Sequence, residues 1–230
     1  MRAVVLQHEE HEGAEQLGPA LQRAGFTLVP RLRTVARGDV DAELVVVMGG
    51  AMSAWETEQH PFLAAERALL EDRLRRAAPC LGICLGAQLL AMAAGAEVLR
   101  GTNGLEVGAA PIQWTAAGRS DPVIAGVGDL VVAHWHEDTF TAVPGASLLA
   151  STARYEQQAF RTGSSYGFQF HVELDAPGLR RWLELGRAEL EANGCDVAAL
   201  RRGAASLETT HDARVALLDR LARHFAAAVA

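Results

Sequence analysis

Short runs of consecutive apolar, often β-branched residues alternate with helical patterns through the first hundred residues. The runs that we expect to be strands are Ala3–Leu6, Phe26–Val29, Leu44–Met48 and Pro79–Ile83. The segments between and after them with helical spacing are Glu15–Ala24, Pro61–Arg76 and Cys84–Ala94. Strands that are apolar throughout are typical of a parallel sheet with both faces covered. The alternation therefore predicts an α/β fold with an open, mostly parallel sheet flanked by helices, whose ligands bind at the carboxyl ends of the strands.

The middle of the chain has a different pattern, with short strand-like pieces separated by Gly and Pro. These pieces are Glu97–Leu99, Leu105–Ile112, Leu130–Ala133, Ser147–Ala153, Gln158–Arg161 and Tyr166–Phe170. We interpret them as antiparallel strands and hairpins added to the same domain. After Pro177 the pattern is helical, over Leu179–Leu190 and Leu207–Val229. We expect a catalytic-type domain over 1–177 and a helical extension over 178–230 that packs on the core.

Composition excludes several classes of partner. The 230 residues carry a formal net charge of -7 and half of them are hydrophobic, so the chain can bury a large core. Such a charge disfavours nucleic acid and anionic membrane as partners. No apolar run is long enough to span a bilayer, and the N-terminus lacks a signal-peptide pattern. Three cysteines (Cys80, Cys84 and Cys195) make no disulfide framework, so we expect a cytoplasmic protein.

The segment Leu81–Gln88 has the pattern of a nucleophile elbow. An apolar strand runs into a turn of small residues with Cys84 at its apex, and a helix follows directly. Gly82 and Gly86 remove side chains where such a turn packs closely. At a helix N-terminus, partial positive charge favours the thiolate, and the N–H of Leu85 can face a developing oxyanion. A lone cysteine is more often a core residue, so this interpretation depends on the motifs that accompany it.

Two further motifs supply what a cysteine nucleophile needs. The strand Val45–Met48 ends in Gly49-Gly50, where a turn can present a backbone N–H to a ligand. The strand of alternating aromatics before His171 is followed by Glu173, and residues two apart in extended backbone share a face. His171 can therefore act as a base that Glu173 orients, although a short His-x-Glu pattern also occurs by chance.

Two polar segments have weaker interpretations. His134-Trp135-His136-Glu137-Asp138 has residues that can bind metal, but we favour a loop close to the substrate and expect neither a metal nor another cofactor. His8–Glu12 follows the first strand, at the edge where ligands are expected. We interpret it as a solvated polar loop, with a substrate-selecting loop as the alternative.

Together the motifs resemble those of the class I glutamine amidotransferase family. Gly82–Gln88 is similar to the family's nucleophile motif and Phe168–Glu173 to its His/Glu motif, in the family's order and at a compatible separation. The likeness extends from Leu6 to about Glu173 and is strongest to small stand-alone proteins resembling the glutaminase domain of GMP synthetase. The resemblance implies a flavodoxin-like sheet and a cysteine-dependent glutaminase.

The resemblance also implies a role for each matching residue. Cys84 would form a γ-glutamyl thioester, His171 would act as base and then acid, and Glu173 would orient His171. The N–H groups of Gly50 and Leu85 would form the oxyanion hole. The α-amino and α-carboxylate groups of glutamine would be held by the Gln88 side chain and by backbone at Met52, Trp135, His136 and Glu137.

Three functions stay open on the sequence. The first is a glutaminase that passes ammonia to a separate synthetase, since no ATP-binding motif is present in the chain. The second is a γ-glutamyl hydrolase or peptidase, which attacks the same carbonyl but releases a larger amine. The third is a regulatory domain that kept the fold without activity.

Overall fold

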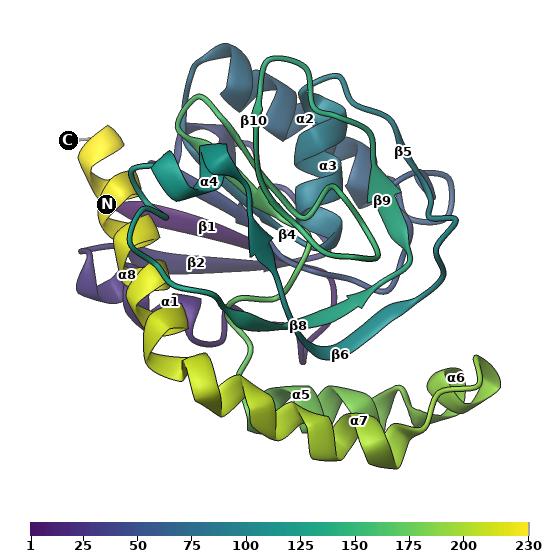
Figure 1. Cartoon of the computed structure of the whole chain (residues 1–230). Coiled ribbons are helices and arrows are strands. Elements are labelled where there is room, and N and C mark those ends of the chain that lie inside the picture. The colour runs from purple at the N-terminus through teal and green to yellow at the C-terminus, as the bar shows by residue number, and fades with distance from the viewer. Residues whose placement is uncertain (230) are drawn as a thin grey trace.

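A central sheet of eight strands runs through the computed structural model, which describes residues 1–229 (Figure 1). Its strand order is β2-β1-β3-β4-β12-β11-β10-β7. In that order the bounds are Thr27–Leu32, Arg2–Gln7, Leu44–Val47, Cys80–Ile83, Ser165–Phe168, Ala159–Thr162, Ser147–Ser151 and Gln113–Trp114. The five strands from β2 to β12 are parallel, and β11, β10 and β7 continue the sheet in antiparallel fashion. The carboxyl ends of β1, β3, β4 and β12 therefore meet at one edge.

Two antiparallel ribbons lie outside this sheet. One pairs β5 (Val98–Arg100) with β9 (Asp138–Phe140), and the other pairs β6 (Glu106–Pro111) with β8 (Val131–His136). A bridge between Ala133 and His171 ties β8 to the segment that follows β12. The end of β8 is thereby held beside the carboxyl edge of the parallel strands.

Helices cover both faces of the sheet, which explains why β3 is buried along its whole length. The bounds of α1 to α8 are Leu17–Arg23, Pro61–Arg75, Leu85–Ala93, Ala116–Ser120, Ala176–Leu185, Arg187–Ala192, Val197–Gly203 and His211–Ala228, and 3-10 turns span Asp39–Asp41 and Ala204–Thr210. Because successive strand residues face opposite sides, Val46 packs in the core with α1 and α8. Val45 and Val47 pack in the core with α2 and α3.

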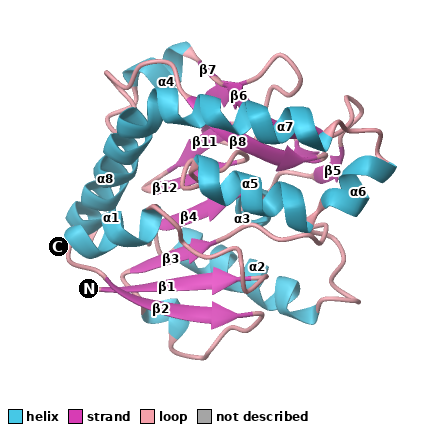
Figure 2. Cartoon of the chain, turned by 90° about the horizontal axis from the view of Figure 1, so that it is seen from below, coloured by secondary structure: helices cyan, strands magenta, loops and turns pink. Residues whose placement is uncertain are grey.

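The C-terminal helices pack on the rest of the molecule in two places. The helix α8 lies along α1, with Leu221 in the same apolar core as Leu21. The helices α5 and α7 lie against the β6–β8 ribbon (Figure 2), and Leu179 and Leu183 pack in one apolar core with Ala133. This position brings α5 close to the carboxyl edge of the sheet.

The predicted fold class, including helices packed at the C-terminus, is confirmed. The helix expected over Leu179–Leu190 is interrupted at Gly186, where a Cβ would collide with the ring of Trp135. The helix expected from Leu207 begins at His211, after the 3-10 turn. Within residues 1–229, no helix combines the length and apolar character that crossing a membrane requires.

Candidate active site

Cys84 occupies a strained turn between β4 and α3. Its φ of 52° and ψ of -111° lie in a region that residues other than glycine rarely adopt. A Cβ on Gly82 would collide with the carbonyl of Gly86, and a Cβ on Gly86 with the carbonyl of Val47. The turn can therefore close only because both flanking residues are glycine, and it places Cys84 at the first turn of α3.

His171 and Glu173 form a buried pair next to this turn. The Nδ1 atom of His171 lies 2.8 Å from Oε1 of Glu173, and the His171 ring meets the edge of Trp182 at a centroid separation of 4.9 Å. Burial lowers the pKa of His171, but the charge of Glu173 and hydrogen bonds with Cys84 and Glu173 outweigh burial and hold that pKa well above its usual value. The surroundings of His171 therefore favour its protonated form.

The sulfur of Cys84 has two other polar neighbours. It lies 3.6 Å from the carbonyl oxygen of Trp135 and 3.7 Å from Nε2 of Gln169. Gln169 is fully buried and accepts a hydrogen bond of 3.1 Å from Nε2 of Gln88. Sequence reasoning missed Gln169, because a glutamine within an apolar strand carries no signal of what lies opposite it.

The backbone N–H groups of Gly50 and Leu85 have no hydrogen-bond partner in the part of the chain that the structure describes. Neither donates a hydrogen bond to any group among residues 1–229. Both residues border the same cavity as Cys84. Both N–H groups are thus available to a ligand in this cavity, and their role as the oxyanion hole stays a prediction.

A cavity of about 320 Å³ opens over Cys84 and His171. It brings together most of the side chains predicted from the sequence, and Glu173 stands behind His171 outside it. The predicted residues at its wall are Gly50, Met52, Cys84, Leu85, Gln88, Trp135, His136, Glu137 and His171. Residues at the wall that the sequence did not connect with the site include Ser53, Arg100, Trp182, Leu185 and Glu189, and Glu12 and Asp138 come from the two polar segments with weaker interpretations.

In the loop after β1, the interpretation as a solvated loop is wrong at His8, whereas Glu10 and His11 are exposed as expected and Glu12 is partly buried. His8 is fully buried, and the Glu12 side chain is 15 % exposed. A Cβ on Gly49 would lie 3.0 Å from Oε2 of Glu12 and 2.9 Å from Cε1 of His171. Burial raises the pKa of Glu12, and the charge of His171 lowers it less. Glu12 thus places a carboxyl group beside the proposed base.

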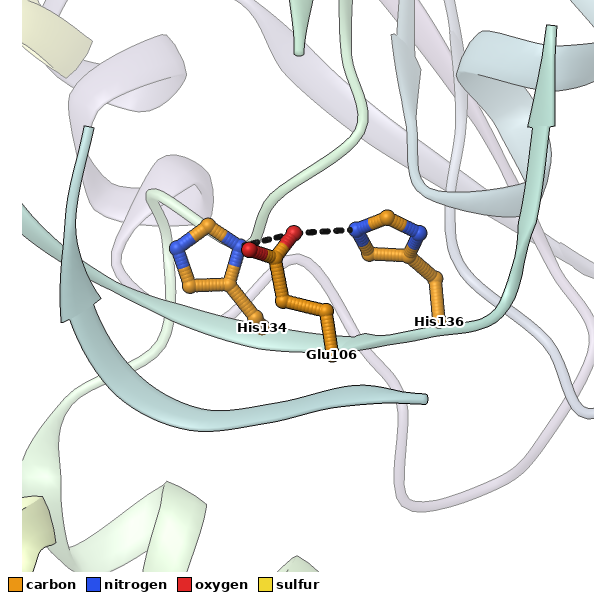
Figure 3. Close-up of side chains that lie close together, drawn as sticks. All are labelled: Glu106, His134 and His136. Carbon is orange, nitrogen blue, oxygen red and sulfur yellow. Dashed lines mark hydrogen bonds and ion pairs between the residues drawn. The ribbon is translucent and has the colours of Figure 1, made fainter. Parts of the chain in front are cut away.

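Within residues 1–229, the structure brings together one group of side chains that could bind a metal ion, namely Glu106, His134 and His136. Their ligand atoms lie within 4.8 Å of one another. Figure 3 shows the Glu106 carboxylate between the two imidazoles. Its Oε2 atom lies 3.0 Å from Nε2 of His136 and accepts a 2.6 Å hydrogen bond from Gln158, while Thr152 donates to Oε1 at 2.8 Å. Both carboxylate oxygens of Glu106 thus already accept hydrogen bonds from protein groups. This arrangement fits a hydrogen-bond network that orients His136.

His134 and Glu106 in this cluster have pKa values that differ from their usual ones for different reasons. Burial lowers the pKa of His134 to about 4, so its ring is neutral at physiological pH. Burial raises the pKa of Glu106, but hydrogen bonds from His136 and Thr152 and the nearby imidazoles bring that pKa below its usual value. The sequence interpretation had grouped the two histidines with Glu137 and Asp138, and Glu106 was missed because it comes from another strand.

Known proteins resemble this chain over most of its length. The family model "Glutamine amidotransferase class-I" matches residues 25–177. The glutamine amidotransferase-like protein YfeJ of Salmonella typhimurium is 31 % identical over 201 residues, which are 83 % of each chain. A crystal structure of a glutamine amidotransferase from Thermotoga maritima superposes with a TM-score of 0.83 at 32 % identity, covering 96 % of this chain and 98 % of that one.

A longer enzyme shares part of the chain. The glutamine-hydrolysing GMP synthase of Symbiobacterium thermophilum is 38 % identical over 103 residues, which are 42 % of this chain and 19 % of that enzyme. The match therefore concerns a minor part of the synthase.

Proposed function

Because this chain belongs to the class I glutamine amidotransferase family, we propose that it hydrolyses the γ-amide of glutamine through a thioester on Cys84. The observation that carries the proposal is the strained turn at Cys84, which faces the buried His171–Glu173 pair and two unpartnered N–H groups across one cavity. A core cysteine needs none of these features.

In the proposed reaction the Cys84 thiolate attacks the γ-carbonyl carbon, and the carbonyl oxygen becomes an oxyanion bound by the N–H groups of Gly50 and Leu85. The protonated His171 then gives its proton to the departing nitrogen as the C–N bond breaks, and ammonia leaves. Water next loses a proton to His171 and attacks the thioester, which releases glutamate and restores the thiolate. Glu173 holds the ring and charge of His171 throughout.

The α end of glutamine is assigned to the opposite side of the cavity from His171. Both N–H bonds of the Gln88 amide are engaged, with the carbonyl of Asp138 at 3.2 Å and with Gln169 at 3.1 Å. This leaves the Gln88 carbonyl oxygen to accept from the α-ammonium group. Backbone at Met52 and from Trp135 to Glu137 completes the proposed contacts.

The test is glutamate release from glutamine by the purified protein. Cys84→Ser is expected to abolish the activity. Cys195→Ser is the matched control, since Cys195 lies after α6 outside the cavity, and should change the rate less than twofold. Equal loss in both variants, or turnover that persists in Cys84→Ser, contradicts the proposed role of Cys84.

A γ-glutamyl hydrolase is the second candidate, and the extent of the cavity favours it. Beyond His171 the wall continues to Trp182, Leu185 and Glu189 on the C-terminal helices, where the leaving group of a γ-glutamyl amine would lie. The same assay with γ-glutamyl amines and glutathione decides between the two. Faster release of glutamate from one of these than from glutamine favours the hydrolase.

The proposal also includes the transfer of ammonia to a separate synthetase and a cytoplasmic location of the protein. The similarity to the hydrolytic part of GMP synthase supports such a partner. Glutamine hydrolysis that rises when a synthetase is added would identify the acceptor.

A further inference from the structure

His8 and Glu66 form a buried pair directly behind the Gly49–Gly50 turn, and the proposed mechanism uses neither residue. Both side chains are fully buried, and Nε2 of His8 lies 2.8 Å from Oε2 of Glu66. The other ring nitrogen, Nδ1, lies 2.6 Å from the carbonyl oxygen of Gly49. Glu66 lies on α2, so the His8 ring links that helix to the peptide group that follows β3.

The direction of that carbonyl fixes the direction of the next N–H. The peptide between Gly49 and Gly50 is trans, so its C=O and N–H bonds point in opposite directions. Since the carbonyl oxygen of Gly49 points to His8, the N–H of Gly50 points away from His8. Gly50 is also the residue that borders the cavity. A half-turn of the peptide would bring the carbonyl oxygen there instead and repel an oxyanion.

Two consecutive glycines do not prevent such a rotation by themselves. They are required here because a Cβ on Gly49 would lie 2.9 Å from the His171 ring, and a Cβ on Gly50 would lie 2.8 Å from Cβ of His8. The site thus needs a mobile dipeptide at the point where orientation matters most. An external group must hold it.

We propose that His8, supported by Glu66, is a positioning residue that holds the Gly49–Gly50 peptide with the N–H of Gly50 directed at the oxyanion. This inference rests on the oxyanion hole of the function proposed above. It implies that the hole is formed in the protein alone, without a partner subunit.

The charge state of His8 fits this role. Both ring nitrogens face acceptors, which a doubly protonated ring satisfies. Burial lowers the pKa of His8, but hydrogen bonds to Glu66 and Gly49 and the charge of Glu66 outweigh burial and raise that pKa above its usual value. Phe62 stacks on the ring at a centroid separation of 5.8 Å and limits its tilt.

Three variants separate positioning from stability. Glu66→Gln removes the buried charge while its amide can still pair with Nε2 of a neutral His8. In the Glu66→Gln background, His8→Asn keeps an N–H donor on Cγ, the atom to which Nδ1 of histidine is attached. The asparagine can therefore still donate to the carbonyl oxygen of Gly49. His8→Gln has its N–H donor one atom further from the backbone, closer to residue 66, and so loses the hydrogen bond to the carbonyl oxygen of Gly49. His60→Gln is a control for replacing a histidine that also lies beside Phe62.

The measurement compares two reactions of Cys84 that need different surroundings. With p-nitrophenyl acetate the thiolate attacks the acetyl carbon and releases p-nitrophenolate, which requires the oxyanion hole. With iodoacetamide it displaces iodide at a saturated carbon, which does not. Cys84→Ser is the blank for both reactions.

Relative to Glu66→Gln, the double variant with His8→Gln should acetylate about 10–100-fold more slowly and alkylate within about twofold. The double variant with His8→Asn should recover most of the acetylation rate. Equal acetylation in both double variants, or a parallel fall of acetylation and alkylation, overturns the proposal. So does a crystal structure of the unaltered protein in which the oxygen of Gly49 faces the cavity.

The outcomes also separate this inference from the proposed function. If the protein cleaves no γ-glutamyl substrate but its acetylation depends on His8 as described, the function fails and the positioning role stands. If glutamine is hydrolysed and acetylation does not depend on His8, the positioning role alone fails.

Discussion

At the scale of single residues, the site depends on groups whose protonation is set by burial and by one close partner. Glu173 lies 2.8 Å from Nδ1 of His171 and raises the pKa of His171 despite burial, whereas burial lowers the pKa of His134 to about 4 although the charge of Glu106 opposes it. The two histidines lie on segments joined by the Ala133–His171 bridge. The opposite pKa shifts of the two histidines therefore arise from local contacts rather than from position in the fold.

Replacing Glu173 should slow turnover less than replacing His171. We expect about a 10³–10⁴-fold loss of kcat for His171→Ala, which removes the proton carrier, and a smaller loss for Glu173→Gln, which leaves the imidazole in place. Removing the carboxylate also lowers the pKa of His171, so the fall in activity at alkaline pH should begin at lower pH in Glu173→Gln. Steady-state rates across pH test both points, and an unchanged profile would remove Glu173 from the site.

Acid should destabilise the protein through His134. The unfolded chain binds a proton here near pH 6.5, whereas the folded protein resists protonation down to a pKa of about 4. Between these values the unfolded state binds more protons, so the free energy of unfolding falls as pH drops, by up to about 3 kcal/mol from this group. Urea unfolding at pH 6.5 and 4 should show a smaller fall for His134→Leu, and an equal fall would contradict the assignment.

At the scale of elements, much of the parallel half was predictable and the additions less so. Strands β1, β3 and β4 lie within two residues of their predicted bounds, because a strand covered on both faces is apolar throughout. The sequence did not indicate α4, α7 or the short strand β9. Their residues make contacts with segments that are distant in the sequence, and the contacts of Gln169 and Glu106 escaped notice for the same reason.

The turn between β4 and α3 makes a prediction about packing. Gly86→Ala should destabilise the protein by about 1–3 kcal/mol or more, because its Cβ meets the backbone of Val47, which cannot move independently. Gly203→Ala is the matched control, since nothing lies within 4 Å of a Cβ at Gly203 and the residue ends α7. Urea unfolding measures both, and equal stability of the two variants would contradict the close approach.

At the scale of the whole molecule, the C-terminal helices complete the cavity that the sheet begins. Trp182 on α5 packs against His171, and Leu185 at the end of α5 borders the cavity while 62 % exposed. An exposed leucine at a cavity rim has room to contact a ligand. Part of the cavity wall is thus built by a part of the chain that lies outside the matched family region, and under the function proposed above it would contact the leaving group.

Shortening this rim should affect large leaving groups selectively. Leu185→Ala is expected to lower kcat/KM for γ-glutamyl-p-nitroanilide by about 3–10-fold, through lost apolar contact, and to change glutamine turnover by less than about twofold. Because Leu185 is exposed, the variant should keep its fold. A parallel change for both substrates would place Leu185 outside the leaving-group side.

The most direct test of the central claim is to intercept the thioester. The protein is incubated with glutamine and hydroxylamine, γ-glutamyl hydroxamate is measured, and rapidly quenched protein is digested to locate the attached γ-glutamyl group by mass spectrometry. The account predicts hydroxamate formation that competes with glutamate release, and a γ-glutamyl group on the peptide that contains Cys84. Glutamate release without hydroxamate, or a γ-glutamyl group on another residue, would contradict it.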